Sequence, residues 1–183
     1  MTLTLHKESV EALRELPHHD PVTVLLVEDS ETDAYAVMRI LSSRMPYSCN
    51  VIYVGTLAEA EQALLESPDI QLVLLDLGLP DASSSREVYA RLEVFKERVP
   101  IVILTGLDDP ELAVDMLGIG AQDYVCKQEI INTPELLART IQFALGRHSS
   151  FRKSQQRILR KLEEKDSLLS LVTGSYSVMQ EVQ

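Results

Sequence analysis

Short runs of apolar residues recur along the chain and alternate with segments that have a helical pattern. Three runs are rich in apolar β-branched and leucine residues and do not alternate with polar ones: residues 22–27 (VTVLLV), 72–75 (LVLL) and 101–104 (IVIL). Such runs are typical of strands that are buried on both faces of a parallel sheet. Two weaker runs, residues 51–54 (VIYV) and 123–126 (DYVC), complete a set of five predicted strands.

The segments between these runs have the signals of helices. Ser30 with Asp33 three residues later resembles a capping box, and Pro110 and Pro134 each follow a residue type that often caps a helix. The first of these segments has one apolar face, made of Ala34, Val37, Met38 and Leu41. A β-α unit repeated five times predicts an α/β fold with a doubly wound parallel sheet and right-handed crossovers.

Charge divides the chain into two parts. The whole chain of 183 residues has a net charge of −11. Residues 147–165, in contrast, include seven Lys and Arg and only two Glu. We therefore predict an N-terminal arm or short helix over residues 1–20 and a compact domain over residues 21–146. Residues 147–183 are expected to form a basic helical extension with no complete output domain.

Composition excludes several classes of protein. Aromatic residues make up 5% of the chain and Trp is absent, so stacking on single-stranded nucleic acid is not expected, and an acidic body disfavours contact with a phosphate backbone. Two cysteines, Cys49 and Cys126, fit a reducing cytosol, and we find neither a signal peptide nor a run long enough to span a membrane. The histidines lack ligand spacing and are expected at the surface: His6, His18, His19 and His148.

Polar residues follow four of the predicted strands directly. Glu28 and Asp29 follow the first strand, Asp76 follows the third, Thr105 the fourth and Lys127 the fifth. The carboxyl ends of parallel strands share one edge of the sheet, and ligands bind there beside the point where strand order reverses. The sequence therefore predicts a cluster of three carboxylates, one hydroxyl and one ammonium group at this edge.

This set of groups fits the acceptance of a phosphoryl group. Clustered carboxylates repel one another unless a cation lies between them, and Mg²⁺ prefers such oxygen ligands. A carboxylate beside Mg²⁺ can act as a nucleophile toward phosphorus. The oxygens of the transferred group can then be neutralised by Mg²⁺, by Lys127 and by the Thr105 hydroxyl, while the small Gly106 leaves the approach open.

Four segments resemble those of a known family, the receiver domain of bacterial two-component response regulators. They are residues 24–30 (VLLVEDS), 72–81 (LVLLDLGLPD), 101–106 (IVILTG) and 123–127 (DYVCK), and the resemblance covers about residues 20–146. It implies a flavodoxin-like fold with strand order 2-1-3-4-5. It also implies a histidine kinase or a histidine phosphotransfer protein as the phosphodonor, with no enzymatic activity beyond self-phosphorylation and self-dephosphorylation.

The resemblance also implies roles for single residues at the metal site. Asp76 is similar in position to the phosphoacceptor of the family. Glu28 and Asp29 resemble the acidic pair that holds Mg²⁺ together with Asp76, and the backbone carbonyl of Gly78 is implied as a further ligand.

Three more residues are implied in binding and switching. Thr105 and Lys127 resemble the switch hydroxyl and the phosphate-binding lysine, and Tyr124 resembles the aromatic residue that changes rotamer on phosphorylation. Two features depart from the family pattern. Gln128 stands where family members usually have proline, and the loop at residues 81–87 (DASSSRE) has no glycine, which predicts an irregular start of the helix that follows.

Two other functions are weighed against the phosphoreceiver. The first is a pseudo-receiver that acts as an unphosphorylated scaffold, but such a protein would lack an acid, the threonine or the lysine. The second is a phosphatase of the haloacid dehalogenase type, which needs a second acid two residues after its nucleophile; here that position is Gly78.

The two ends of the chain leave alternatives open. Apolar positions between Leu3 and Leu16 fit either a short docking helix or a frayed arm. From Ile141 to Val172 a spacing of three and four residues predicts a coiled-coil seam and a homodimer, although Gly146 costs about 1 kcal/mol in a helix interior. The alternatives are a solvated helix and a basic face that contacts an acidic surface.

The last residues leave the extent of the protein open. Residues 171–180 (LVTGSYSVMQ) faintly resemble the opening of a diguanylate cyclase domain. The chain is therefore either the N-terminal part of a larger regulator or a regulator that lost its effector.

Overall fold

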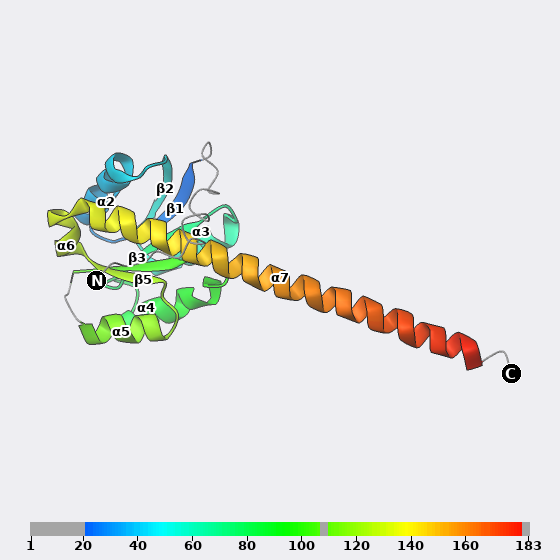
Figure 1. The fold of residues 1–183 in the computed structure, drawn as a ribbon. Helices are drawn as coiled ribbons and strands as arrows, with labels where there is room; N and C mark the ends of the chain where they lie inside the picture. Colours follow the sequence, from blue (N-terminus) through cyan, green and yellow to red (C-terminus); the bar gives the residue numbers. More distant parts are fainter. Residues whose placement is uncertain (1–20, 107–109, 181–183) are drawn as a thin grey trace. The chain divides into compact units, whose positions relative to one another are not determined.

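The five apolar runs form the five strands of one parallel sheet (Figure 1). The computed structural model describes the backbone of residues 21–106 and 110–180, and the side-chain surroundings of residues 21–106 and 114–165. The sheet has the order β2-β1-β3-β4-β5, which confirms the predicted fold class. The strands are β1 (Val22–Val27), β2 (Cys49–Val54), β3 (Leu72–Asp76), β4 (Ile101–Thr105) and β5 (Asp123–Cys126).

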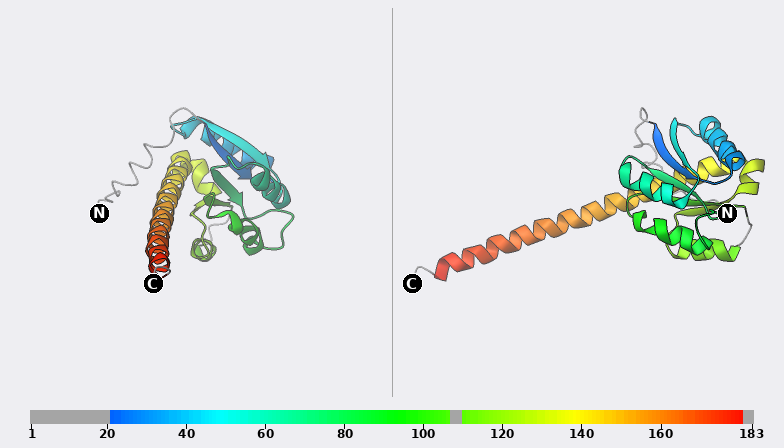
Figure 2. Two further views of the ribbon diagram at one scale, coloured as in Figure 1. Left: turned by 90° about the vertical axis from the view of Figure 1, so that its right-hand side faces the viewer. Right: turned by 180° about the vertical axis from the view of Figure 1, so that it is seen from behind.

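Helices cover both faces of the sheet, as the two views of Figure 2 show. One face packs against α3 (Leu57–Glu66), α4 (Ser85–Leu92) and α5 (Pro110–Gly118), and a 3₁₀ turn, η1 (Glu93–Phe95), follows α4. The other face packs against α2 (Glu31–Arg44), α6 (Lys127–Asn132) and the first turns of α7 (Pro134–Gln180). The short α6 was not predicted.

Burial on both faces explains why the strands read as continuous apolar runs. In β1, Leu25 and Val27 join the cluster under α3 and α4, whereas Val24 and Leu26 join the cluster under α2 and α7. Every residue of β3 and β4 is buried. A fully buried Leu, Ile or Val stabilises the fold by about 1.5–3 kcal/mol relative to an exposed one, so this layer is the main source of stability.

The strand order brings the predicted site residues to one edge. The chain passes from β1 outward to β2 and then back across β1 to β3, so the first reversal of strand order lies between β1 and β3. Val27 is in register with Leu75, and Thr105 with Cys126. Because all strands are parallel, the residues that follow Val27, Leu75 and Cys126 emerge side by side.

The helix that follows the loop at residues 81–87 begins in an ordinary way, so the prediction of an irregular start is wrong. The Ser84 hydroxyl accepts the backbone N–H of Glu87 and caps α4. In the same loop, Asp81 has a role that the sequence did not indicate. Its carboxylate accepts the backbone N–H groups of Leu57 at 2.9 Å and Ala58 at 3.0 Å, and so caps the start of α3.

The described chain forms two compact units, residues up to 148 and residues from 149 onward, and α7 contributes to both. In the first unit, α7 buries Leu137, Ile141 and Ala144 in the core. His148 is also buried, with 7% of its surface exposed, so the expectation of a surface histidine is wrong at this position. Residues 1–20, with the predicted docking helix or frayed arm, lie outside the described residues.

The predicted seam of α7 is corrected at its beginning. Ile141, Ala144 and His148 are buried inside the first unit, so they are not available to a second chain. The side chains of Leu169 and Val172 lie outside the described residues.

Among the described helices, including α7, none combines the length and hydropathy that a membrane crossing requires.

The cap on α3 predicts a pH-dependent contribution to stability. Asp81→Ala removes both hydrogen bonds and should lower the free energy of unfolding by about 1 kcal/mol at neutral pH. The bond from the Leu57 N–H, together with that from Ala58, holds the pKa of Asp81 below its usual value despite some desolvation. A lowered folded-state pKa means that the contribution is present above the unfolded pKa and is lost as pH falls through the folded one.

Urea unfolding of the wild type and Asp81→Ala at neutral and acidic pH measures this effect, and the difference should shrink on acidification. Asp69→Ala, at an exposed loop position, is the control and should change stability little at either pH. A difference for Asp81→Ala that stays constant with pH would contradict the capping role.

Candidate functional site

Three carboxylates meet at the carboxyl edge of the sheet. Glu28 and Asp29 directly follow β1, and Asp76 is the last residue of β3. One carboxylate oxygen from each lies within 4.8 Å of the others, with Glu28 and Asp76 buried and Asp29 exposed. This spacing and these hard oxygen donors fit a divalent cation such as Mg²⁺, which would be held by few protein ligands and completed by water.

Lys127 places its ammonium group among these carboxylates. Its Nζ lies 2.5 Å from Glu28 Oε2 and 3.1 Å from Asp76 Oδ1. It also lies 3.2 Å from Asp33 Oδ2, and its side chain is only 12% exposed. Lys127 is the first residue of α6, so the end of β5 and the start of this helix together fix where the side chain begins.

Burial determines the electrostatics of Glu28 and Lys127. Desolvation raises the pKa of the Glu28 carboxyl, and the charge of Asp76 adds to this rise, while the hydrogen bond from Lys127 opposes it. Burial alone would lower the pKa of Lys127, but its hydrogen bond to Glu28 and the charges of Asp76 and Glu28 outweigh that effect and raise it. The ammonium therefore stays charged, and the buried Glu28 carboxylate is a group that a further cation would stabilise.

Gly78 leaves room for the Asp76 carboxylate. Its backbone N–H donates to Asp76 Oδ2 at 3.1 Å. A Cβ atom at position 78 would lie 3.1 Å from the same oxygen, so any side chain there would crowd the carboxylate. The geometry thus gives Gly78 a steric role, and its predicted role as a carbonyl ligand stays a prediction.

The structure places Thr105 and Tyr124 at different depths. Thr105 ends β4, is buried, and is in register with Cys126, directly before Lys127. Tyr124 is in register with Ile103, two positions farther from the edge, and packs against the cluster formed with α3, α4 and α5. Thr105 is thus at the edge itself, while Tyr124 lies on the helix-covered face behind it.

Asp33 belongs to the site and was missed by the reasoning from sequence, which treated it only as part of a helix cap. Its carboxylate is the third that Lys127 contacts. The available signal was its position in the first turn of α2, the helix that directly follows the acidic segment after β1. The search for polar residues directly after each predicted strand could not identify Asp33, because Asp33 lies within a helix.

Residues 24–140 match the family model described as the response regulator receiver domain. The chain is 40% identical over 116 residues to the cell cycle response regulator CtrA of Brucella ovis, an alignment that covers 63% of this chain and 47% of CtrA. The chain therefore spans about half the length of the curated relatives it matches.

Solved structures with a similar fold include a metal-bound response regulator and a coiled-coil fusion. The Mn²⁺-bound form of the response regulator Rcp1 is 26% identical with a TM-score of 0.53, over 64% of this chain and 91% of that one. A fusion that contains a trimeric coiled-coil segment of yeast Spc42 is 22% identical with a TM-score of 0.63, over 84% of this chain and 97% of that one. The second likeness concerns the fold alone.

The carboxylate cluster predicts a measurable cation site. Asp29→Asn should weaken Mg²⁺ binding by about tenfold or more, because it removes one of three charged ligands. Titration of Mg²⁺ followed by backbone amide NMR shifts of residues 28–30 and 76–78 measures the affinity. Glu31→Gln, which removes an exposed acid outside the cluster, is the matched control, and equal affinities of the two variants would exclude Asp29 as a ligand.

Proposed function

The chain belongs to the response regulator receiver domain family, and we propose that it accepts a phosphoryl group on Asp76 in the presence of Mg²⁺. The observation that carries the proposal is the surroundings of this carboxylate. Asp76 lies within 4.8 Å of the two other carboxylates of the cluster and 3.1 Å from the Lys127 ammonium, at the carboxyl edge of the sheet.

The reaction needs a donor with a labile phosphorus bond. In the proposed step, a carboxylate oxygen of Asp76 attacks the phosphorus of a phosphohistidine on a histidine kinase or a phosphotransfer protein. The new P–O bond forms as the P–N bond breaks, and the electron pair of that bond returns to the imidazole, which takes up a proton. Glu28, Asp29 and Asp76 would hold a bound Mg²⁺, which would supply positive charge to the phosphoryl oxygens.

The remaining residues stabilise and sense the transferred group. We assign Lys127 to one phosphoryl oxygen, because its ammonium already lies at Asp76. Thr105, buried at the neighbouring strand end, is assigned to a second oxygen through its hydroxyl. A shift of Thr105 toward the phosphoryl group would change the packing on β4 and β5, which is how Tyr124 would respond. The carbonyl of Gly78 is retained as a proposed metal ligand.

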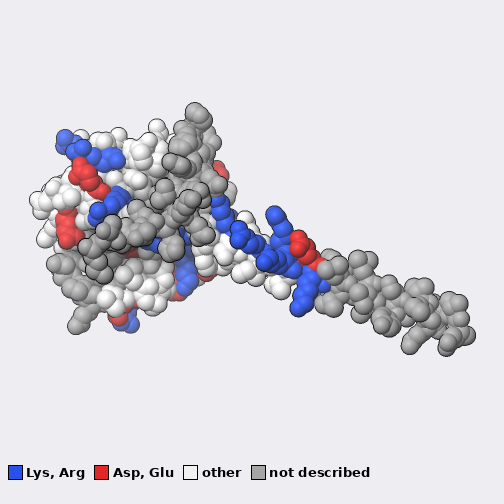
Figure 3. Space-filling view, viewed as in Figure 1, with Lys and Arg blue, Asp and Glu red and all other residues white. Residues whose placement is uncertain are grey.

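A second copy of the chain is the proposed partner of the C-terminal helix. Every side chain from residue 151 to residue 165 is exposed, among them Phe151 (47%), Ile158 (56%), Leu159 (58%) and Leu162 (53%). Basic side chains gather around them (Figure 3). An isolated helix of this kind is marginally stable in water unless an apolar stripe is covered. A parallel pairing through Phe151, Ile158 and Leu162 would cover it, and a solvated helix is the alternative.

The domain division and the output are also proposals. We assign residues 21–146 to the receiver and residues 147–183 to the helical extension, which would pass the signal on through dimer rearrangement or partner binding in the cytoplasm. Because the chain spans about half of CtrA, a larger regulator, for example one with a diguanylate cyclase domain, remains a candidate for the whole protein. Direct nucleic-acid binding and catalysis beyond self-phosphorylation and self-dephosphorylation are not proposed for these residues.

Phosphorylation tests the central assignment. Acetyl phosphate with Mg²⁺ should add one labile phosphate to the wild type, and intact-mass measurement should detect it. Asp76→Asn should remain unmodified, because the amide nitrogen and oxygen replace the nucleophilic carboxylate. Asp69→Asn, at an exposed loop position, should be modified like the wild type. An unmodified wild type would favour the scaffold function, and a modified Asp76→Asn would place the acceptor elsewhere.

The oligomeric state tests the helix pairing. Ile158→Glu with Leu162→Glu would put four acids across a two-chain seam, so it should convert a dimer to a monomer while the receiver stays folded. Light scattering measures the mass. The control is Gln156→Glu with Arg160→Glu, which adds acids on the opposite side of the helix and should remain dimeric. A dimer that survives the seam variant would place the contact on another surface.

A further inference from the structure

We propose that Asp33 holds Lys127 before phosphorylation and competes with the incoming phosphoryl group for its ammonium. Asp33 is thus a positioning residue that sets how readily Lys127 changes partners. The inference rests on the proposed function of Asp76. It concerns a contact between two elements, α2 and the start of α6, whose residues are 94 positions apart in the chain.

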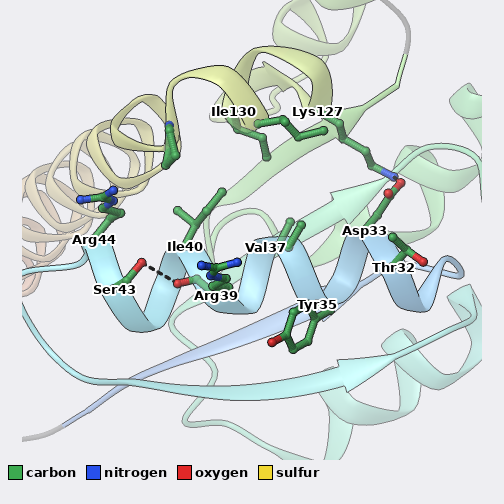
Figure 4. A pocket seen from close by; sticks show the side chains of 13 residues that line it. Thr32, Asp33, Tyr35, Val37, Arg39, Ile40, Ser43, Arg44, Lys127 and Ile130 are labelled. Carbon is green, nitrogen blue, oxygen red and sulfur yellow. Dashed lines mark hydrogen bonds and ion pairs between the residues drawn. The ribbon is translucent and has the colours of Figure 1, made fainter.

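The Asp33 carboxylate is not used to cap its own helix. In a capping box, the acid at this position reaches back to the backbone N–H of the capping residue. Here that N–H, of Ser30, donates instead to Glu28 Oε1 at 3.2 Å. Ser30 caps α2 through its hydroxyl, which accepts the backbone N–H of Asp33 at 3.3 Å, so the cap does not depend on the Asp33 side chain. Figure 4 shows the carboxylate turned toward Lys127.

Three carboxylates lie around the Lys127 ammonium at ion-pair distance, and the contact with Asp33 also has the geometry of a hydrogen bond. A lysine ammonium has three N–H groups and no acceptor, and Nζ lies within 3.2 Å of an oxygen of Glu28, Asp76 and Asp33. A phosphoryl oxygen on Asp76 would be a further acceptor at the same nitrogen. One of the existing contacts must therefore weaken when the phosphoryl group takes its place.

Exposure decides which contact yields. The side chains of Glu28 and Asp76 are 0% and 9% exposed, whereas that of Asp33 is 42% exposed. A carboxylate that loses its partner in a buried place pays the full desolvation penalty, but water can replace the partner of a half-exposed one. Water alone can therefore replace the ammonium at Asp33, whereas release of Glu28 or Asp76 requires a cation such as Mg²⁺ in its place.

The contact also lies at one end of a groove. The groove between α2 and α6 has a volume of about 580 Å³, with Asp33 and Lys127 at one end and Val37, Ile40 and Ile130 in its apolar middle (Figure 4). Release of Lys127 would leave an unpaired carboxylate at this end. The state of Asp76 would thus change the charge of the groove without any movement of the helices.

Binding of beryllium fluoride with Mg²⁺, a mimic of the phosphoryl group, tests the competition. Asp33→Asn keeps the shape and the helix cap but removes the charge, so it should bind the mimic about two- to fivefold tighter than the wild type, the range expected for a partly exposed ion pair. Glu31→Gln is the matched control. It removes an acid from the same helical turn without touching Lys127, and it should change the affinity less than Asp33→Asn.

A double-mutant cycle isolates the contact. In a Lys127→Gln background, Asp33→Asn should behave like Glu31→Gln, because the ammonium for which Asp33 competes is gone. Asp33→Glu, which restores the charge, should return the affinity toward the wild-type value. Urea unfolding should show that both acid-to-amide variants fold, because neither loses the Ser30 cap.

Three outcomes would overturn the inference alone, given a wild type that binds the mimic. They are equal affinities of Asp33→Asn and Glu31→Gln, weaker binding by Asp33→Asn, and persistence of the Asp33→Asn effect in the Lys127→Gln background. A wild type that does not bind the mimic would overturn the role of Asp76 and this inference together, so the two failures are distinguishable.

Discussion

One buried ammonium group offsets part of the negative charge at the carboxyl edge of the sheet. Lys127 contacts Glu28, Asp76 and Asp33, and each of these acids comes from a different segment of the fold. Without that charge, a fully buried Glu28 beside Asp76 would carry a large desolvation penalty. The contacts join β1, β3, α2 and α6, so the electrostatics of the site and the arrangement of these elements depend on each other.

The cluster has a charge balance that favours exchange of partners. Three carboxylates are available to a cation, and a different set of three surrounds the ammonium, with Glu28 and Asp76 common to both. A divalent cation and a phosphoryl group together would redistribute these contacts without unpaired charge in the interior. This is the physical reason for a receiver to combine acids and a lysine in one small site, and Gly78 keeps that site open.

One apolar stripe runs along the long helix α7, buried in the first turns and exposed beyond them. Its first turns bury Ile141 and Ala144 against the sheet, and His148 ends that contact. From Phe151 to Lys165 the side chains are exposed. The same spacing of three and four residues continues through both parts, because an apolar stripe on a helix has the same period whether the sheet or another helix covers it. The basic charge begins where the burial ends.

The sequence by itself determined the sheet and the identity of the groups at its edge. Runs such as residues 72–75 and 101–104 are local patterns, and a parallel sheet fixes where their ends lie. Only the tertiary structure decided that Asp33 reaches Lys127, and that the stripe of α7 is first covered within its own chain. Local patterns indicate which residues are apolar and tend to be buried and which are charged. The residue that each of them contacts depends on elements that are distant in sequence.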